Sequence, residues 1–301
     1  MKISIIIPSY NQAGLLEETL RSLLKEEGPK EVLVVDGGST DGSVEILERY
    51  ETELACWVSE PDRGQADAIN KGLARMTGEV WMFLNSDDLL EKGALSMVRE
   101  VFRDAAVDWV AGDALVFDQA RDLGVIRPEP PGRIMDYLRP WRRASQYVFP
   151  FSGASFMRRS VFERLGGFDA SLHYCMDIDY YLRAVFRLGL AYHHVPQILA
   201  RWRRHSDSKT EREGVAYAFR EEEVVLARRY SDVLTEEERE ELGRDLRFEE
   251  RQTLARKASF WAASGRRNEG WSILWNGLCR DPALLSFRPW WGAVRRCWSW
   301  R

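Results

Sequence analysis

The sequence has few cysteines, no long apolar run and no large excess of either charge, and each absence excludes a class of protein. Its 301 residues include four cysteines, without a CxxC pair or the cysteine and histidine spacing of a metal site. We therefore expect buried thiols in a reducing, cytoplasmic compartment. No stretch approaches the roughly 18 apolar residues of a membrane-spanning helix, so we expect neither such a helix nor a secretory signal.

Charge is abundant but balanced. The chain carries 43 lysines and arginines against 47 aspartates and glutamates, a net charge of −4. The overall field therefore gives no reason to expect a nucleic acid partner. Hydrophobic residues make up 45% of the chain, which is enough for a large core and predicts a globular protein.

Short apolar runs alternate with helix-period segments over the first hundred residues. The runs lie in KISIIIP, EVLVVD, LACWVS and EVWMFLN, and the segment after the first one repeats leucine at helical spacing. This alternation predicts an α/β fold with a mostly parallel sheet and helices on both faces. From Glu211 the pattern becomes charged amphipathic helix, with Thr235 and Glu238 as a capping box. We expect one domain over residues 1–210 and a helical extension over 211–301.

Three of the four predicted strands end in polar or acidic residues, at the edge where such sheets bind ligands. These are Ser9-Tyr10-Asn11, Asp36 and Asn85-Ser86-Asp87-Asp88. Asp36 precedes a glycine-rich turn, where it could contact a ribose or a base, or serve only as a turn and cap residue. The later cluster NSDD ends in Asp87 and Asp88, whose mutual repulsion a divalent cation would relieve. Oxygen ligands favour Mg²⁺ or Mn²⁺, while a helix N-cap is the structural alternative.

Two further regions are unusual in composition. Residues 127–143 are rich in proline and arginine, which predicts a surface loop with one short helix. Seven of the twelve tryptophans lie in the last 41 residues, among arginines. This pattern is typical of a surface that contacts anionic lipid or another subunit, whereas the alternative is that the indoles pack the extension onto the catalytic domain. The residues concerned are Trp261, Trp271, Trp275, Trp290, Trp291, Trp298 and Trp300, with Arg288, Arg295, Arg296 and Arg301.

Six motifs resemble, in order, those of the family-two inverting glycosyltransferases, which have the GT-A fold and use nucleotide-activated sugars. They extend from residue 8 to residue 210. Several ordered motifs are far more specific than any single one. They read PSYNQAGLLEETLRSLL, VVDGGSTDGS, SEPDRGQADAINKG, TGEVWMFLNSDD, GGFDASLHYCMDIDYYLR and RWRRHSDSKT.

The resemblance implies roles for individual residues. Asp177 matches the catalytic base, although Met176 replaces the glutamate that usually precedes it. Asp87 matches the second acid of the family's Asp-x-Asp metal motif, and Asn85 stands at the first. The donor pocket would be bordered by Pro8, Tyr10, Asp36, Arg63, Asp67, Asn85 and Ser86, and the metal would be held by Asp87, Asp88 and His205.

The implied activity is metal-dependent transfer of a sugar, with inversion, from a nucleotide diphosphate of the UDP or dTDP type. The acceptor would be a hydroxyl of a glycan or lipid-linked molecule, in surface polysaccharide biosynthesis at the inner face of the plasma membrane. A non-catalytic nucleotide-sugar-binding scaffold is an alternative, raised by Asn85 and Met176 together. A sugar nucleotidyltransferase is a second one, although PSYNQAGLLEE lacks the glycine-rich, lysine-containing phosphate loop which that class would need.

Overall fold

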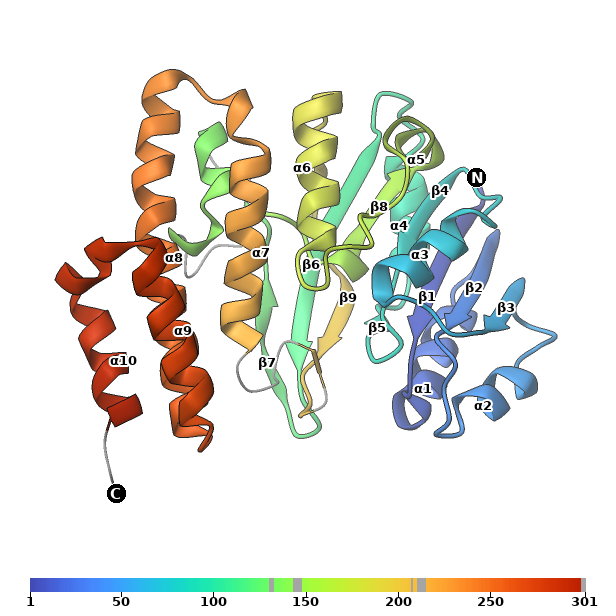
Figure 1. Ribbon diagram of the computed structural model, residues 1–301. Helices are drawn as coiled ribbons and strands as arrows, with labels where there is room; N and C mark the ends of the chain where they lie inside the picture. Colours follow the sequence, from blue (N-terminus) through green and yellow to red (C-terminus); the bar gives the residue numbers. More distant parts are fainter. Residues whose placement is uncertain (130–132, 143–147, 207, 210–214, 299–301) are drawn as a thin grey trace. The chain divides into compact units, whose positions relative to one another are not determined.

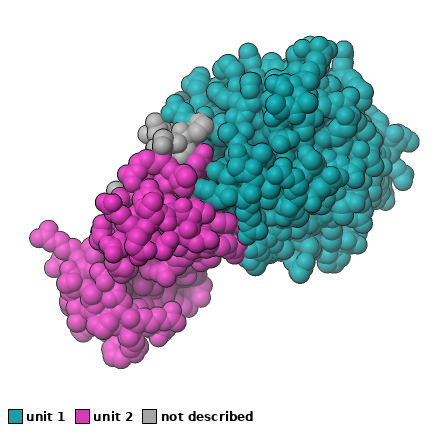
Figure 2. All heavy atoms as spheres, turned by 90° about the horizontal axis from the view of Figure 1, so that it is seen from above, with its two compact units in different colours: residues 1–131, 145–205 teal, residues 132–144, 206–301 magenta. Residues whose placement is uncertain are grey.

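The computed structural model describes residues 1–129, 133–142, 148–206, 208–209 and 215–298. The chain divides into two compact units (Figure 2). The first contains residues 1–131 and 145–205, and the second contains residues 132–144 and 206–301. The second unit is therefore built from two separate segments of the chain.

The first unit is built on one mixed sheet (Figure 1). Within the described residues its strands run in the order β3-β2-β1-β4-β8-β6-β9-β5, and β7 pairs with β6. The first four strands are mutually parallel, and β6 is parallel to β9, while β5, β7 and β8 pair with their neighbours in the antiparallel sense. The strands are β1 (Ile3–Ser9), β2 (Lys30–Asp36), β3 (Cys56–Ser59), β4 (Val80–Phe83), β5 (Leu89–Leu90), β6 (Trp109–Phe117), β7 (Asp122–Ile126), β8 (Ser155–Arg158) and β9 (His193–Arg203).

Helices cover the sheet because its central strands must be buried on both faces. Every residue of β1 is buried, and the predicted leucine face of α1 packs into the same core through Leu16, Leu20 and Leu23. Helix α3 approaches β1 so closely that a Cβ on Gly72 would lie 2.4 Å from Ile6 Cγ2. The helices are α1 (Ala13–Leu24), α2 (Ser43–Arg49), α3 (Gln65–Leu73), α4 (Ala94–Val101), α5 (Arg159–Leu165) and α6 (Met176–Leu188), with a 3₁₀ turn at Ser152–Ala154. The predicted α/β class is confirmed.

The second unit is helical. Thr235 and Glu238 form the predicted capping box of its longest helix, because each side chain accepts a hydrogen bond from the other residue's backbone N–H. In the part of the chain that the model describes, no helix is both long and apolar enough to cross a bilayer. The elements are α7 (Val215–Arg229), α8 (Glu236–Ala263), α9 (Arg267–Arg280) and α10 (Arg288–Trp298), with 3₁₀ turns at Ile134–Leu138, Pro140–Arg142, Ser231–Val233 and Pro282–Ser286.

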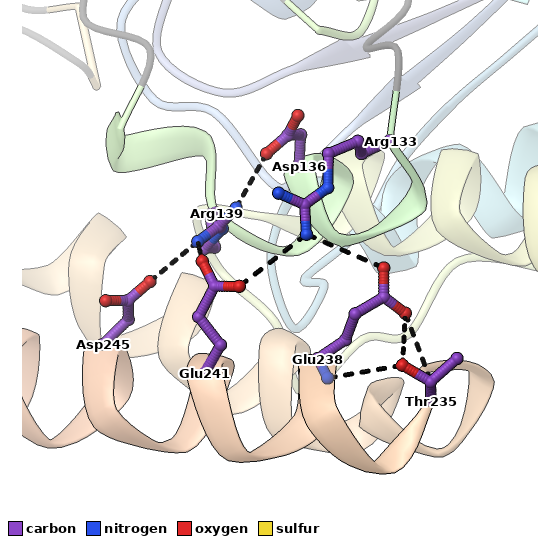
Figure 3. Close-up of polar contacts among 7 residues, drawn as sticks. All are labelled: Arg133, Asp136, Arg139, Thr235, Glu238, Glu241 and Asp245. Atoms are coloured by element: carbon purple, nitrogen blue, oxygen red, sulfur yellow. Dashed lines mark hydrogen bonds and ion pairs between the residues drawn. The ribbon is translucent and has the colours of Figure 1, made fainter.

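Residues 133–142, the described later part of the segment expected to be a surface loop, belong to the second unit and are held there by a buried arginine (Figure 3). Arg139 is 4% exposed and donates hydrogen bonds to Glu241 (2.7 Å) and Asp245 (3.0 Å) of α8, and to Asp136 (3.0 Å). Removing one partner of such a buried ion cluster typically costs about 3 to 5 kcal/mol. The predicted short helix is present as the turn Ile134–Leu138, but the burial of Arg139 could not be predicted because its partners are distant in the sequence. Residues 130–132 and 143 of the stretch lie outside the described residues.

Candidate functional site

Three parallel strands end side by side at the carboxyl edge of the sheet. In the register of the sheet Asp36 lies between Ser9 and Ser59. The Asp36 carboxylate is fully buried and accepts hydrogen bonds from the backbone N–H groups of Gly38 (3.0 Å) and Ser39 (2.8 Å), and from the hydroxyls of Ser59 (2.7 Å) and Ser39 (2.5 Å). Asp36 therefore shapes the glycine-rich turn that follows it.

The loop after β1 is tied to this turn. The Asn11 backbone N–H donates to Ser39 Oγ (2.7 Å), and Asn11 Oδ1 accepts from the Thr40 N–H (2.9 Å). Asn11 has a φ of 51°, a left-handed conformation that asparagine tolerates better than most residues. The next residue back, Tyr10, is 63% exposed, whereas Pro8 is buried within β1. The two loops thus present a tyrosine ring at the edge.

Arg63 and Asp67 lie at the start of α3, beside the same edge. Arg63 donates to Asp67 through its guanidinium (3.0 Å) and its backbone N–H (3.2 Å). The hydrogen bond from the Arg63 side chain, more than any other cause, holds the pKa of Asp67 below its ordinary value. Asp67 is therefore a positioning partner for Arg63, whose side chain is 78% exposed.

The NSDD cluster follows β4, and Asn85 is its connecting residue. Asn85 Oδ1 accepts a hydrogen bond from Gln65 Nε2 (2.6 Å), and Asn85 Nδ2 donates to Asp88 Oδ2 (3.0 Å). An ionised aspartate at position 85 has no N–H to donate to Asp88. It would also add a negative charge beside Asp88, which already lies next to the charge of Asp87. The departure from the family's acid thus has a structural reason in this chain.

Asp88 points into the protein. It is 1% exposed, and its Oδ1 accepts a hydrogen bond from the backbone N–H of Arg203 on β9 (2.9 Å). Burial, and after it the negative charge of Asp87, raises the pKa of Asp88 well above its ordinary value. Ser86 is also buried, and its carbonyl accepts a hydrogen bond from Thr19 (3.0 Å). Both oxygens of Asp88 are therefore engaged within the protein.

Asp87 lies next to His205, and the family resemblance implies that these two residues hold a metal together with Asp88. Asp87 Oδ2 lies 3.0 Å from His205 Nε2, and the two side chains are 18% and 14% exposed. The carbonyl of Asp87 accepts a hydrogen bond from Arg203 Nε (2.9 Å). Within the described residues no three His, Cys, Asp or Glu side chains gather as a ready-made metal site. A cation held by this pair would need phosphate oxygens and water to complete its coordination, and the imidazole ligand suits Mn²⁺ better than Mg²⁺.

Asp177 lies in the first turn of α6. Its charge contributes to a raised pKa of Tyr181 one turn later, although burial of that phenol is the larger cause. Asp179 is buried and accepts a hydrogen bond from Arg183 (2.9 Å), which also donates to the carbonyl of Gly167. Asp179 therefore anchors the helix, whereas Asp177 is half-buried at its start.

The link between Asp177 and the Asp87 region is indirect. The loop before α6 lies against α3, where Asn70 exchanges hydrogen bonds with the backbone of Phe168 (2.7 and 2.9 Å). A Cβ on Gly64 would lie 3.8 Å from His173 Nδ1 of this loop. Because Gln65 then reaches Asn85, α3 connects the start of α6 to the NSDD cluster.

Two residues that support the site were not assigned by sequence reasoning. Gln65 lies in the motif SEPDRGQADAINKG, but nothing in that motif indicated a contact with Asn85. Arg203 lies in the motif RWRRHSDSKT, where the sequence does not distinguish it from the neighbouring arginines. Its guanidinium is buried, contacts Glu18 and lies 4.7 Å from the centre of the Phe117 ring, so it holds the NSDD cluster against β9.

Solved structures define the fold. Staphylococcus aureus TarS 1-349 in complex with UDP-GlcNAc superposes with a TM-score of 0.60 at 19% identity, over 99% of this chain and 80% of that chain. The mannosyltransferase PcManGT from Pyrobaculum calidifontis, in complex with GDP-Man and Mn²⁺, gives 0.57 at 21% identity, over 98% and 87%. A mixed sheet that carries its polar residues at the carboxyl edge, in this topology, is a GT-A fold.

The sequence identifies the family within that fold. The family model described as glycosyl transferase family 2 matches residues 4–166, and the chain belongs to this family. An uncharacterized glycosyltransferase of Mycobacterium tuberculosis is 32% identical over 184 residues, covering 60% of this chain and 68% of the relative. The S. aureus poly(ribitol-phosphate) β-N-acetylglucosaminyltransferase TarS is 38% identical over 112 residues, 35% of this chain and 18% of TarS. In the longer TarS structure this chain spans only 43% of the TarS chain.

Proposed function

We propose that this glycosyltransferase moves one sugar, with inversion, from a nucleoside diphosphate to a hydroxyl of a glycan or lipid-linked acceptor in cell-surface polysaccharide synthesis. Membership of family 2 supports the transfer. Neighbours of the same fold bind UDP-GlcNAc and GDP-Man, which supports a nucleotide-sugar donor. The relative TarS acts on poly(ribitol phosphate), which supports a surface-polymer acceptor.

The observation that carries the proposal is the pairing of Asp87 with His205 at the edge where β4 ends. Asp87 and His205 would hold Mg²⁺ or Mn²⁺, and a divalent cation in this place supplies positive charge to the diphosphate as it leaves. Asp88 would act behind them, because its hydrogen bonds with Asn85 and Arg203 fix the backbone that presents Asp87. The Mn²⁺ bound with GDP-Man in the Pyrobaculum structure supports a cation of this kind.

The donor would lie against the loops after β1 and β2. Asp36 would act through the turn it organises, whose backbone can approach a ligand closely at Gly37 and Gly38. Tyr10 and Arg63 expose a ring and a guanidinium there, suited to a nucleoside and to a phosphate. Asp67 and Asn85 would position the groups around the donor pocket, and the buried Pro8 and Ser86 would lie behind it.

Asp177 would act as the general base. Its carboxylate would take the proton of the acceptor hydroxyl while that oxygen forms a bond to C1 of the donor sugar. The bond from C1 to the diphosphate oxygen breaks on the opposite face, and its electron pair leaves with the nucleoside diphosphate. One such displacement inverts C1. The first turn of α6 favours the ionised carboxylate, because the N-terminus of a helix carries partial positive charge.

Replacement of the base tests this assignment. We expect Asp177→Asn to lower turnover by about 10² to 10⁴-fold with little change in donor affinity. Glu45→Gln is the matched control, since Glu45 is a first-turn acid of α2 outside the proposed site. Steady-state kinetics with titration of nucleoside diphosphate would measure both quantities. Full turnover by Asp177→Asn would reject Asp177 as the base.

A panel of nucleotide sugars tests the activity itself. Thermal unfolding with UDP-, dTDP- and GDP-sugars, each with and without Mn²⁺, should show stabilisation by the true donor because ligand binding shifts the folding equilibrium. The same donor should be slowly hydrolysed. A non-catalytic scaffold would be stabilised without releasing nucleoside diphosphate, and that result would favour the scaffold alternative over transfer.

A further inference from the structure

The two C-terminal helices carry an exposed aromatic face. Trp275, Trp291 and Trp298 are 68%, 48% and 67% exposed. All other tryptophans in the described residues are buried or half-buried. Single exposed apolar residues are common on proteins, but several exposed indoles within two adjacent helices mark an interaction surface. Trp300 and Arg301 lie outside the described residues.

Helices α9 and α10 lie side by side, with the chain turning back between them (Figure 1). The rings of Trp271 on α9 and Trp298 on α10 have centroids 5.9 Å apart. Trp275 follows Trp271 by one turn, and Trp291 precedes Trp298 by two turns. Because helical residues at these spacings lie on the same face, the four indoles form one surface.

The opposite side of α10 forms the core of the second unit. Trp290, Ala293 and Cys297 are buried there with Leu274 and Leu284. Of the two roles considered for the C-terminal tryptophans, packing therefore accounts for Trp290. Trp271 is half-buried and packs against the edge of this core, whereas Trp275, Trp291 and Trp298 are exposed and lie outside it.

Arginines lie on the same outward stripe of α10. Arg288 and Arg295 are exposed and alternate with Trp291 and Trp298 at spacings of three and four residues. Within the part of the chain that the model describes, neither guanidinium forms an ion pair. Their charge is therefore available to an external partner.

Charge is segregated along the second unit. Residues 215–250 contain twelve acidic and six basic residues, whereas residues 251–298 contain nine basic and two acidic ones. Those two acids, Glu269 and Asp281, already pair with Arg266 and Arg251. The exposed indoles thus lie in the positively charged part of a chain whose overall charge is negative.

We propose that this tryptophan–arginine face, made of Trp271, Trp275, Arg288, Trp291, Arg295 and Trp298, binds an anionic phospholipid surface. Indoles prefer the level of the lipid head groups, and arginines are attracted to anionic lipid. A second copy of this chain would bring like charges together, which opposes self-association through the same face. Several anchors are required because a single weak contact does not hold a protein on a membrane.

Vesicle sedimentation of the full chain tests the proposal. We expect it to sediment with vesicles of equal parts phosphatidylglycerol and phosphatidylcholine, less so as salt is raised, and not with phosphatidylcholine alone. Arg288→Gln with Arg295→Gln should weaken partitioning by about 25-fold, at about fivefold for each arginine near an anionic surface. Alanine at Trp275, Trp291 and Trp298 together should weaken it at least as much.

Matched controls separate this face from net charge and from misfolding. Arg103→Gln with Arg164→Gln removes the same charge from exposed arginines of the first unit and should leave partitioning unchanged. Circular dichroism and thermal unfolding should match the parent chain. Equal losses in both arginine pairs, or no binding to anionic vesicles, would overturn the proposal. Light scattering that shows a dimer dissociated by the tryptophan variant would assign the face to a second copy and would also overturn it.

Discussion

The two edges of the central sheet shift the pKa of a buried acid in opposite directions. At the amino edge Glu31 accepts hydrogen bonds from Ser4 (2.5 Å) and from the backbone and hydroxyl of Thr77 (2.6 and 2.7 Å), and it pairs with Lys2. Burial acts to raise the pKa of Glu31, but these partners outweigh it and lower the pKa to about 2. At the carboxyl edge, burial and the adjacent Asp87 raise the pKa of Asp88.

This difference separates stability from function within one sheet. The amino edge gives its acid a full set of donors and a cation, so ionised Glu31 stabilises the fold. The carboxyl edge places two carboxylates next to each other, an arrangement that is unfavourable until something positive binds. We infer that the fold accepts this cost because the proposed ligand site lies at this edge.

The largest effect should come from the carboxyl edge. Asp87→Asn removes the proposed cation ligand and should lower turnover by about 10² to 10³-fold, as loss of one electrostatic group in an active site commonly does. Stability should be unchanged or slightly higher, because the repulsion with Asp88 is relieved. Steady-state kinetics would measure the loss of turnover, and thermal unfolding would measure stability. A variant that lost both turnover and stability would contradict this expectation.

The amino edge should show the reverse. Glu31→Gln should lower the free energy of unfolding by about 3 kcal/mol at neutral pH, with turnover of the folded enzyme unchanged. Because the folded pKa is below the ordinary 4.5, this stabilisation is fully present above about pH 4.5 and disappears as the pH falls toward 2.

Denaturant unfolding of parent and variant from neutral to acid pH would measure the effect of Glu31. The two free energies should converge in acid. Glu79→Gln is the control, since Glu79 lies at the same edge with its side chain 67% exposed, and it should change stability by less than about 1 kcal/mol. A constant difference at every pH would show that charge is not the cause.

A smaller effect is expected from restoring the family's acid. Asn85→Asp replaces the amide that donates to Asp88 with a carboxylate, and should lower the free energy of unfolding by about 1 to 2 kcal/mol at neutral pH. The loss should shrink when Mn²⁺ and a nucleoside diphosphate are added. Denaturant unfolding would measure both, with the exposed Asn276→Asp as control. If Asn85→Asp is as stable as the parent chain, the hydrogen bond to Asp88 is not the reason for an asparagine at this position.

Much of the fold could be predicted because its signals are local. The apolar run of β1 is buried on both faces, and the leucines of α1 repeat at helical spacing, so neighbouring residues alone indicate each element. The capping box at Thr235 is a signal of four residues. Arg139 shows the limit of prediction from local signals, because its partners Glu241 and Asp245 lie 102 and 106 residues further along the chain. Periodicity does not report contacts at such distances.

The sequence predicted which strand ends carry the candidate site residues, but not the direction or the hydrogen-bond partners of their side chains. The position of Asp36 and Asp87 after apolar strands placed both at the carboxyl edge. That the Asp36 carboxylate is used by its own turn, or that Asp88 faces Arg203, depends on side-chain direction, which the sequence pattern does not encode. The catalytic, donor and metal roles remain predictions for the experiments above.

The split composition of the second unit bears on how this protein can be recombined or shortened. Residues 132–144 lie between two stretches of the first unit, yet Arg139 depends on acids that follow residue 240. A fragment that stops at His205 would keep the arginine and lose two of its counter-ions. A chimera that exchanges the C-terminal helices with those of a homologue must therefore exchange residues 132–144 as well. The two segments have to be transferred together because they form one compact unit.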